Sequence, residues 1–173
     1  EGKLIGVGVA AAVKNVGFGK GAVENAGVTL KLNADGSVLL EHSQHEYGQG
    51  AGSALAQFAS TVLGTPVKNI ELIGPDTAIT PPTGPTTASR QTFLTGNAVV
   101  RAAEKLKGEA IERASRLLKV DTDRLELNLD RVIDKETGEY VLLEKLGEQF
   151  VVKEQYNAPR TTPLLEVGKR SNY

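Results

Sequence analysis

Two short loops of the chain carry groups that suit an anionic ligand. The first loop, residues 46–53, contains Gly48, Gln49 and Gly50 and lies between a predicted strand and a predicted helix. Glycines allow a ligand to approach the backbone closely, the first turn of a helix presents unpaired N–H groups to a phosphate, and the Gln49 amide both donates and accepts. A sharp turn without a ligand explains the glycines equally well, because one glycine-rich turn is a weak signal.

The second loop, residues 83–92, leads into a long predicted helix. Its ten residues include four threonines, one serine, one arginine and one glutamine, among them Thr86, Ser89, Arg90 and Gln91. An N-cap role for Ser89 or Thr92 accounts for one hydroxyl only. The cation of Arg90 is unfavourable beside the positive end of the helix dipole unless an anion lies between them. We therefore expect this loop to bind an anion, and we expect loss of the Arg90 side chain to leave stability unchanged or slightly improved when that anion is absent.

Two other kinds of site fit the first loop less well. Its three glycines loosely match the dinucleotide-binding fingerprint, but residues 42–47 are polar where that fold requires a buried parallel strand, and no acidic residue ends a second strand about twenty positions later. His42 and His45 lie beside Glu46, yet residues three apart on a strand point to opposite faces. We interpret the two histidines as surface or loop residues rather than as metal ligands.

The composition excludes several classes of protein. The 173 residues include no cysteine and two histidines, which excludes disulfides, iron–sulfur ligation, thiolate zinc sites and histidine-rich metal sites. A formal net charge of -1 gives no general attraction to nucleic acid or to an anionic membrane, and no apolar run has the length that crosses a bilayer. The sequence begins at Glu1 without a methionine or a signal-peptide pattern. We expect a cytoplasmic protein of which this sequence is one piece.

The periodicity of apolar residues predicts an α+β fold, with a mixed, largely antiparallel sheet packed against two main helices. Residues 28–40 alternate in polarity on both sides of Asp35-Gly36, which indicates a β-hairpin. The helices are expected from residue 51 to the stop at Gly64 and over residues 94–119. Further strands are expected at residues 4–13, 70–73, 125–129, 132–133, 140–142 and 150–152. We interpret residues 1–173 as one lobe, with an extended C-terminal arm that starts near residue 157.

Taken in order, the motifs of the chain resemble those of the large subunit of molybdenum hydroxylases, the family of xanthine dehydrogenase and aldehyde oxidase. The resemblance runs through the first two thirds of the chain, whereas the last third agrees only in general layout. Gly-Gln-Gly alone is weak, but its order and spacing with Ala-Ser-Arg and Gly-Asn-Ala are specific. The motifs are Asp35-Gly36-Ser37-Val38, Glu46-x-Gly48-Gln49-Gly50, Gln57, Asp76-Thr77-x-x-Thr80-Pro81, Gly84-x-Thr86-x-Ala88-Ser89-Arg90-x-Thr92 and Gly96-Asn97-Ala98-Val99.

The resemblance implies a molybdenum–molybdopterin cofactor, with or without a cytosine dinucleotide, in an oxidoreductase that acts on purine-like heterocycles or aldehydes. By analogy, Gly48, Gln49 and Gly50 contact the pterin and phosphate region, and Thr86, Ser89, Arg90 and Gln91 contact phosphate or the nucleotide end. The resemblance also implies iron–sulfur and FAD groups on other domains or subunits, contacts with the rest of the large subunit, and an oligomeric enzyme. Nucleic acid and membrane are not expected as partners.

Departures from the family pattern affect what this chain does alone. Residues 43–45 are more polar than the family's glycine-rich form, and the Gly-Glu pairs at 108–109, 138–139 and 147–148 lack the glycines that surround the family's catalytic glutamate. We therefore assign no catalytic residue and no metal ligand, and we expect the isolated chain to be inactive. The alternative is a non-catalytic subunit-interaction domain that docks through its proline-rich loop and its tail.

Overall fold

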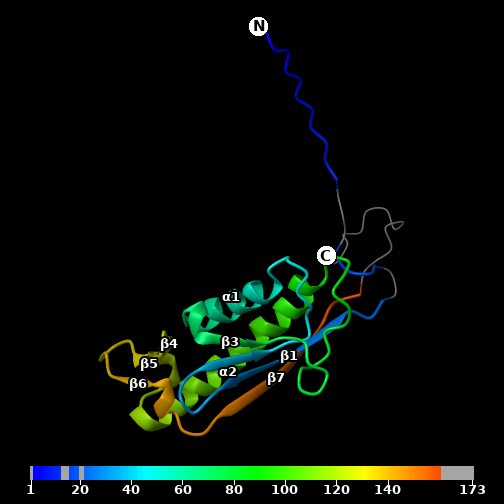
Figure 1. Ribbon diagram of the computed structural model, residues 1–173. Helices are drawn as coiled ribbons and strands as arrows, with labels where there is room; N and C mark the ends of the chain where they lie inside the picture. The colour runs from blue at the N-terminus through cyan, green and yellow to red at the C-terminus, as the bar shows by residue number, and fades with distance from the viewer. Residues whose placement is uncertain (1, 13–15, 20–21, 161–173) are drawn as a thin grey trace.

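A computed structural model describes residues 2–12, 16–19 and 22–160. Within these residues the chain forms a four-stranded sheet, a separate three-stranded sheet and two α-helices (Figure 1). The four-stranded sheet has the order β3-β2-β1-β7, in which β1 is antiparallel to β2 and β7, and β2 is parallel to β3. Its strands are β1 (Asn25–Leu32), β2 (Val38–Glu41), β3 (Ile70–Ile73) and β7 (Phe150–Asn157). The predicted mixed, largely antiparallel sheet is therefore confirmed.

The β1–β2 hairpin follows from its turn. Gly36 adopts a φ of 84°, a left-handed conformation that favours glycine. The backbone N–H and the hydroxyl of Ser37 both donate to Asp35 Oδ1, at 2.9 and 2.7 Å. These bonds fix the register in which Leu32 faces Val38, so the buried side chains of both strands point to the same face.

Helices α1 (Ala51–Leu63) and α2 (Gln91–Leu118) pack against each other and cover one face of the four-stranded sheet (Figure 1). Apolar residues three and four apart give each helix one buried stripe. In α2 this stripe is rich in alanine, including Ala98, Ala102 and Ala110, which allows close approach to the sheet. Leu30, Leu40 and Leu55 are fully buried in the layer between helices and sheet; burial of such a side chain stabilises the fold by roughly 1.5–3 kcal/mol. Helix α2 begins at Gln91, three residues before its predicted start, so the polar residues that precede the apolar stripe are helical as well.

Residues 125–142 form a sheet of their own rather than extending the first. This sheet comprises β4 (Leu125–Asn128), β5 (Arg131–Asp134) and β6 (Tyr140–Leu142), all antiparallel, beside the C-terminal part of α2. Asp134 holds its turn: it accepts a hydrogen bond from the Glu136 N–H at 2.9 Å and pairs with Arg124. The Glu136 N–H is the main cause that lowers the pKa of Asp134 to about 2. Short 3₁₀ turns lie at Val67–Asn69, Thr122–Arg124 and Leu143–Lys145.

The N-terminal end of the chain differs from the prediction, and most of the C-terminal end lies outside the described residues. Residues 4–12 form no strand, because no strand of the described chain pairs with them, and they extend away from the body (Figure 1). Leu4, Ile5, Val7 and Val9 are at least 85% exposed. Strand β7 is longer than predicted, and most of the expected C-terminal arm, from residue 161, lies outside the described residues. Within the part of the chain that the structure describes, no helix combines the length and apolarity needed to span a bilayer.

Candidate functional site

The first and second loops meet at one pocket of about 560 Å³. A hydrogen bond ties the start of the first loop to the second, because the backbone N–H of His45, the residue before the first loop, donates to the hydroxyl Oγ1 of Thr86 at 3.0 Å. The pocket thus gathers five of the seven predicted binding residues, and the other two, Gly48 and Gly50, flank Gln49 in the first loop. The described residues that line it include no acidic one; they are Tyr47, Gln49, Thr86, Thr87, Ala88, Ser89, Arg90, Gln91 and Thr92.

Helix packing brings the two loops together. Gly96 of α2 lies so close to α1 that a Cβ at this position would meet Phe58 Cε2 at 2.8 Å. The chain before the second loop crosses β1, where the Gly27 N–H donates to the Pro82 carbonyl at 2.9 Å. The N-terminal ends of both helices therefore face the same region, which accounts structurally for the Gly96 and second-loop motifs.

The first loop is closed by its own side chains. Glu46 Oε1 accepts the N–H groups of Gly48 and Gly50 at 2.7 and 2.9 Å, and Glu46 Oε2 accepts the N–H of Ala51 at 2.7 Å. These bonds, that of Gly50 above all, lower the pKa of Glu46, so its carboxylate is charged at neutral pH. Gln49 Oε1 accepts the Tyr47 N–H at 2.5 Å. The sequence interpretation missed Glu46, although a carboxylate shortly before a helix start is a recognisable capping signal.

The second loop is held by Arg90, whose side chain turns inward. Arg90 is 3% exposed, and its Nε donates to Glu24 Oε2 at 2.7 Å. Its Nη1 donates to the carbonyls of Thr83 and Pro85 at 2.8 and 2.9 Å, and its Nη2 donates to the Asn25 carbonyl at 3.2 Å. The anion beside Arg90 is therefore Glu24 of the same chain, and the inference that Arg90 requires a bound anion is wrong.

Gln91 has a similar inward role. It is buried, its Nε2 donates to the carbonyls of Gly84 and Pro85 at 3.0 and 3.1 Å, and its Oε1 accepts the Thr95 hydroxyl at 2.5 Å. Ser89, in contrast, is exposed at the pocket. The loop therefore presents hydroxyl groups to the pocket while Arg90 and Gln91 hold its carbonyls from behind.

The residues just before α2 are strained and leave the helix end open. Ala88 and Ser89 have φ values of 52° and 53°, a region that costs roughly 1–3 kcal/mol for such residues and is typical of functional sites. Helix α2 has no side-chain N-cap and no acidic residue in its first turn. Its positive end therefore remains uncompensated by the side chains of that turn, in contrast to the end of α1 beside Glu46.

Two buried polar atoms lie in the segment that leads into the first loop. His42 Nδ1 and Gln44 Oε1 have no hydrogen-bond partner among the described residues, although the two side chains are only 4% and 2% exposed. Burial lowers the pKa of His42, so the imidazole is neutral at pH 7. His42 lies in the loop that follows β2, as expected, although its side chain is buried there, and His45 is exposed. Nowhere in the described chain do three or more metal-ligating side chains gather.

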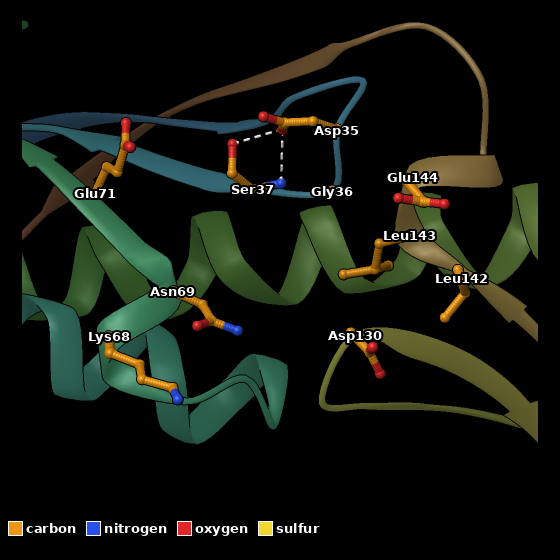
Figure 2. A pocket seen from close by; sticks show the side chains of 10 residues that line it. All are labelled: Asp35, Gly36, Ser37, Lys68, Asn69, Glu71, Asp130, Leu142, Leu143 and Glu144. Atoms are coloured by element: carbon orange, nitrogen blue, oxygen red, sulfur yellow. Dashed lines mark hydrogen bonds between the residues drawn. The ribbon is translucent and has the colours of Figure 1, made fainter.

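A second pocket, of about 420 Å³, lies away from the two loops, between the β1–β2 turn and the small sheet (Figure 2). Carboxylates from both sides line it, and Lys68 is the one cation among its described lining residues. Such a lining repels an anionic ligand. Its acidic residues are Asp35, Glu71, Asp130 and Glu144.

Comparison with known proteins agrees with the motifs. The profile of a molybdopterin cofactor-binding domain matches residues 1–167. The chain belongs to this family. It is 30% identical over 166 residues to a probable xanthine dehydrogenase subunit of Bacillus subtilis, covering 94% of this chain and 22% of the relative. It is 32% identical over 139 residues to the putative xanthine dehydrogenase molybdenum-binding subunit of Escherichia coli, covering 80% of this chain and 18% of the relative.

Solved structures share the fold. The Cu,Mo-CO dehydrogenase matches with a TM-score of 0.73 at 24% identity, over 85% of this chain and 21% of that one. The aldehyde oxidoreductase from Desulfovibrio desulfuricans matches with a TM-score of 0.55 at 29% identity, over 83% of this chain and 14% of that one. The chain thus spans less than a quarter of the length of each of these proteins.

Proposed function

We propose that this molybdopterin cofactor-binding domain works within a molybdenum-dependent hydroxylase or dehydrogenase that acts on purine-like heterocycles or aldehydes. Relatives named xanthine dehydrogenase and a structural neighbour named aldehyde oxidoreductase support these substrate classes. The observation that carries the proposal is the pocket between the two loops. It combines exposed hydroxyls and an open helix end with a described lining free of acidic residues, as an anionic cofactor requires.

The residues of this pocket fit molybdopterin. An added Cβ at Gly48 or Gly50 would meet no atom within 4 Å, so a flat ring system has room to approach the backbone there. The hydroxyls of the second loop suit the phosphate. The orphaned atoms of His42 and Gln44 leave the adjoining segment with polar groups that no described residue of this chain satisfies.

We assign the predicted binding residues two roles. Gly48 and Gly50 give a surface free of side chains, and Gln49, Thr86 and Ser89 make polar contacts with the cofactor. Arg90 and Gln91 act through the second loop, because their side chains bind its carbonyls. When bound, the cofactor supplies a metal centre that takes electrons from the substrate while water provides the oxygen. No residue of this chain is assigned as the catalytic base.

The remaining parts of the enzyme follow from the same proposal. Several relatives are named as subunits, among them the Bacillus subtilis protein and the gamma subunit of a 6-hydroxypseudooxynicotine dehydrogenase complex from Paenarthrobacter nicotinovorans. We infer iron–sulfur and flavin partners that carry electrons away, a cofactor with or without a cytosine dinucleotide, an oligomeric assembly and a cytoplasmic location.

The test is metal and pterin analysis of the complete protein, produced with its partner subunits in a host that makes the cofactor. We expect stoichiometric molybdenum and pterin, and turnover of a purine-like heterocycle or an aldehyde. A protein that remains free of molybdenum, while a known xanthine dehydrogenase from the same host is loaded, would contradict the proposal.

One observation favours an additional role in assembly. The apolar residues Leu4, Ile5, Val7 and Val9 are exposed in an extended segment, which is typical of a strand that pairs with another part of a protein. If the complete protein shows no molybdenum but loses its assembly when this segment is deleted, the domain serves interaction rather than cofactor binding.

A further inference from the structure

The carboxylate of Glu46 occupies the place that the sequence assigned to a phosphate. The N–H groups at the start of a helix are the donors that bind phosphate in such loops. In this chain the N–H groups of Gly48, Gly50 and Ala51 already donate to the two oxygens of Glu46, at 2.7 to 2.9 Å. A bound phosphate at this point would have to displace a charged acceptor that belongs to the loop itself.

The charge of Glu46 also serves the helix. Helix α1 has no acidic residue in its first turn and no side chain that caps it from the N-cap position, Gly50. A negative charge near the N-terminus stabilises a helix. Glu46 provides this charge from outside the helix, through the Ala51 N–H. The end of α1 is thereby compensated without a ligand.

The same bonds determine the shape of the loop around Gln49. Gly48 and Gly50, on either side of Gln49, have φ values of 99° and 74° and both donate to one oxygen of Glu46. From the other side, Gln49 Nε2 donates to the His45 carbonyl at 2.8 Å. Gln49 is thus held between two sets of bonds at the wall of the pocket.

We propose that Glu46 is a positioning residue for the cofactor. Its ionised carboxylate holds the Gly48-Gln49-Gly50 backbone in the shape against which the cofactor lies, and it keeps the anionic part of the cofactor away from the start of α1. This inference rests on the proposed function, since it assumes that the pocket binds molybdopterin. Glu46 itself makes no contact with the reacting atoms.

Protonation of Glu46 gives the proposal a pH signature. The pKa of Glu46 is lowered in the folded protein, chiefly by the Gly50 N–H. Its contribution is therefore fully present above the ordinary glutamate pKa and is lost as the pH falls through the lowered value. When the wild-type enzyme is acidified, cofactor release should therefore increase over the pH range in which Glu46 becomes protonated. A Glu46→Gln enzyme has no charge to lose at this position, so its release should lack this increase.

The experiment compares Glu46→Ala, Glu46→Gln and the exposed control Glu104→Ala in the complete, cofactor-loaded enzyme. We expect Glu46→Ala to raise amide hydrogen exchange over residues 46–52 about tenfold or more, because several charge-assisted bonds are lost, and to lower molybdenum content. Glu46→Gln keeps one acceptor oxygen and should be intermediate in both measurements. Glu104→Ala should match the wild type.

Two results overturn the proposal. The first is unchanged hydrogen exchange over residues 46–52 in Glu46→Ala. The second is raised exchange in Glu46→Ala with full retention of molybdenum, together with a Glu46→Gln enzyme whose acid-release profile matches that of the wild type. Failure of the proposed function looks different. In that case the wild-type enzyme itself contains no molybdenum, the cofactor role of Glu46 falls with it, and the exchange data still decide whether Glu46 orders the loop.

Discussion

The two loops look alike in sequence but solve the same electrostatic problem in opposite ways. Each precedes a helix, and each was predicted to hold an anion. In the first loop, Glu46 supplies the negative charge and binds the N–H groups at the start of α1. In the second loop, the charged side chain is a cation, Arg90, and it is buried in an ion pair with the carboxylate of Glu24.

This difference separates the tasks of the loops. In the first loop, the positive end of α1 is compensated by Glu46 of the same loop. The loop therefore offers a ligand a glycine-rich backbone surface rather than a positive charge. The second loop offers exposed hydroxyls at a helix end that no side chain caps. Binding of an anion should therefore depend on the second loop for electrostatic attraction by its helix end and on the first loop for a backbone surface of the right shape.

Arg90→Ala should have the largest effect on stability. It leaves the carboxylate of Glu24, which is 4% exposed, without its ion-pair partner, and it frees two carbonyls of the second loop and the Asn25 carbonyl of β1. Removal of one partner from a buried ion pair costs about 3–5 kcal/mol of unfolding free energy. The measurement is equilibrium denaturation of the chain.

Arg101→Ala is the matched control for this substitution. Arg101 is exposed, and its guanidinium lies 4.7 Å from the ring centre of Tyr156. An exposed contact of this kind contributes roughly 0.5–1 kcal/mol. Equal losses for the two arginines would show that Arg90 is not the anchor of the second loop, and an unchanged stability for Arg90→Ala would restore the original expectation from the sequence.

Gly96→Ala should separate the two loops by forcing the helices apart. The new Cβ would lie 2.8 Å from Phe58 Cε2, so the ring or the helix must shift. Overpacking of this kind costs about 1–3 kcal/mol. Gly108→Ala in the same helix is the control, because a Cβ added there would meet no atom within 4 Å. This substitution should stabilise the helix by about 0.5–1 kcal/mol. Thermal unfolding of both variants should show shifts of opposite sign; shifts of the same sign would contradict the close packing.

Gly50→Val tests the shape of the first loop. Gly50 has a φ of 74°, where a side chain costs roughly 1–2 kcal/mol and a β-branched one is strongly disfavoured. The complete enzyme should lose molybdenum while its other parts remain folded. Gly74→Val is the control, since Gly74 has open space and no left-handed φ. Full molybdenum content in the Gly50 variant would reduce the first loop to a simple turn.

Local patterns predicted most of the fold. The β1–β2 hairpin lies where alternation placed it, β3 lies at the predicted residues 70–73, and α1 ends at Gly64, whose φ is 68°. These features depend on residues close in sequence. Residues 4–12 have the composition of a strand as well, but a strand requires a partner, and pairing is not encoded locally. The separation of β4–β6 into a second sheet was missed for the same reason.

The site was predictable as a set of positions but not as a set of roles. The ordered motifs placed Gln49, Thr86 and Ser89 at one pocket. The direction of Arg90 was not predictable, because its partner Glu24 is 66 residues away and sequence spacing gives no distance between them. The strain at Ala88 and Ser89 has no signature in residue types that favour φ < 0.

Ser89→Ala is the smallest and sharpest test of the comparison. Ser89 is exposed, lies at the pocket and has no hydrogen-bond partner among the described residues. Alanine keeps the backbone cost of the φ of 53°, so unfolding free energy should change by less than about 0.5 kcal/mol. If the hydroxyl donates to the cofactor phosphate, its loss removes about 1 kcal/mol of binding, or roughly a fivefold change in cofactor retention. Ser53→Ala, an exposed serine in the first turn of α1, is the control, because Glu46 already compensates that helix end. We expect retention to fall for Ser89→Ala alone, measured as molybdenum content after dialysis of the complete enzyme. An equal fall for both serines would mean that the two helix ends receive the anion alike, and no fall for either would remove the hydroxyl of the second loop from the binding site.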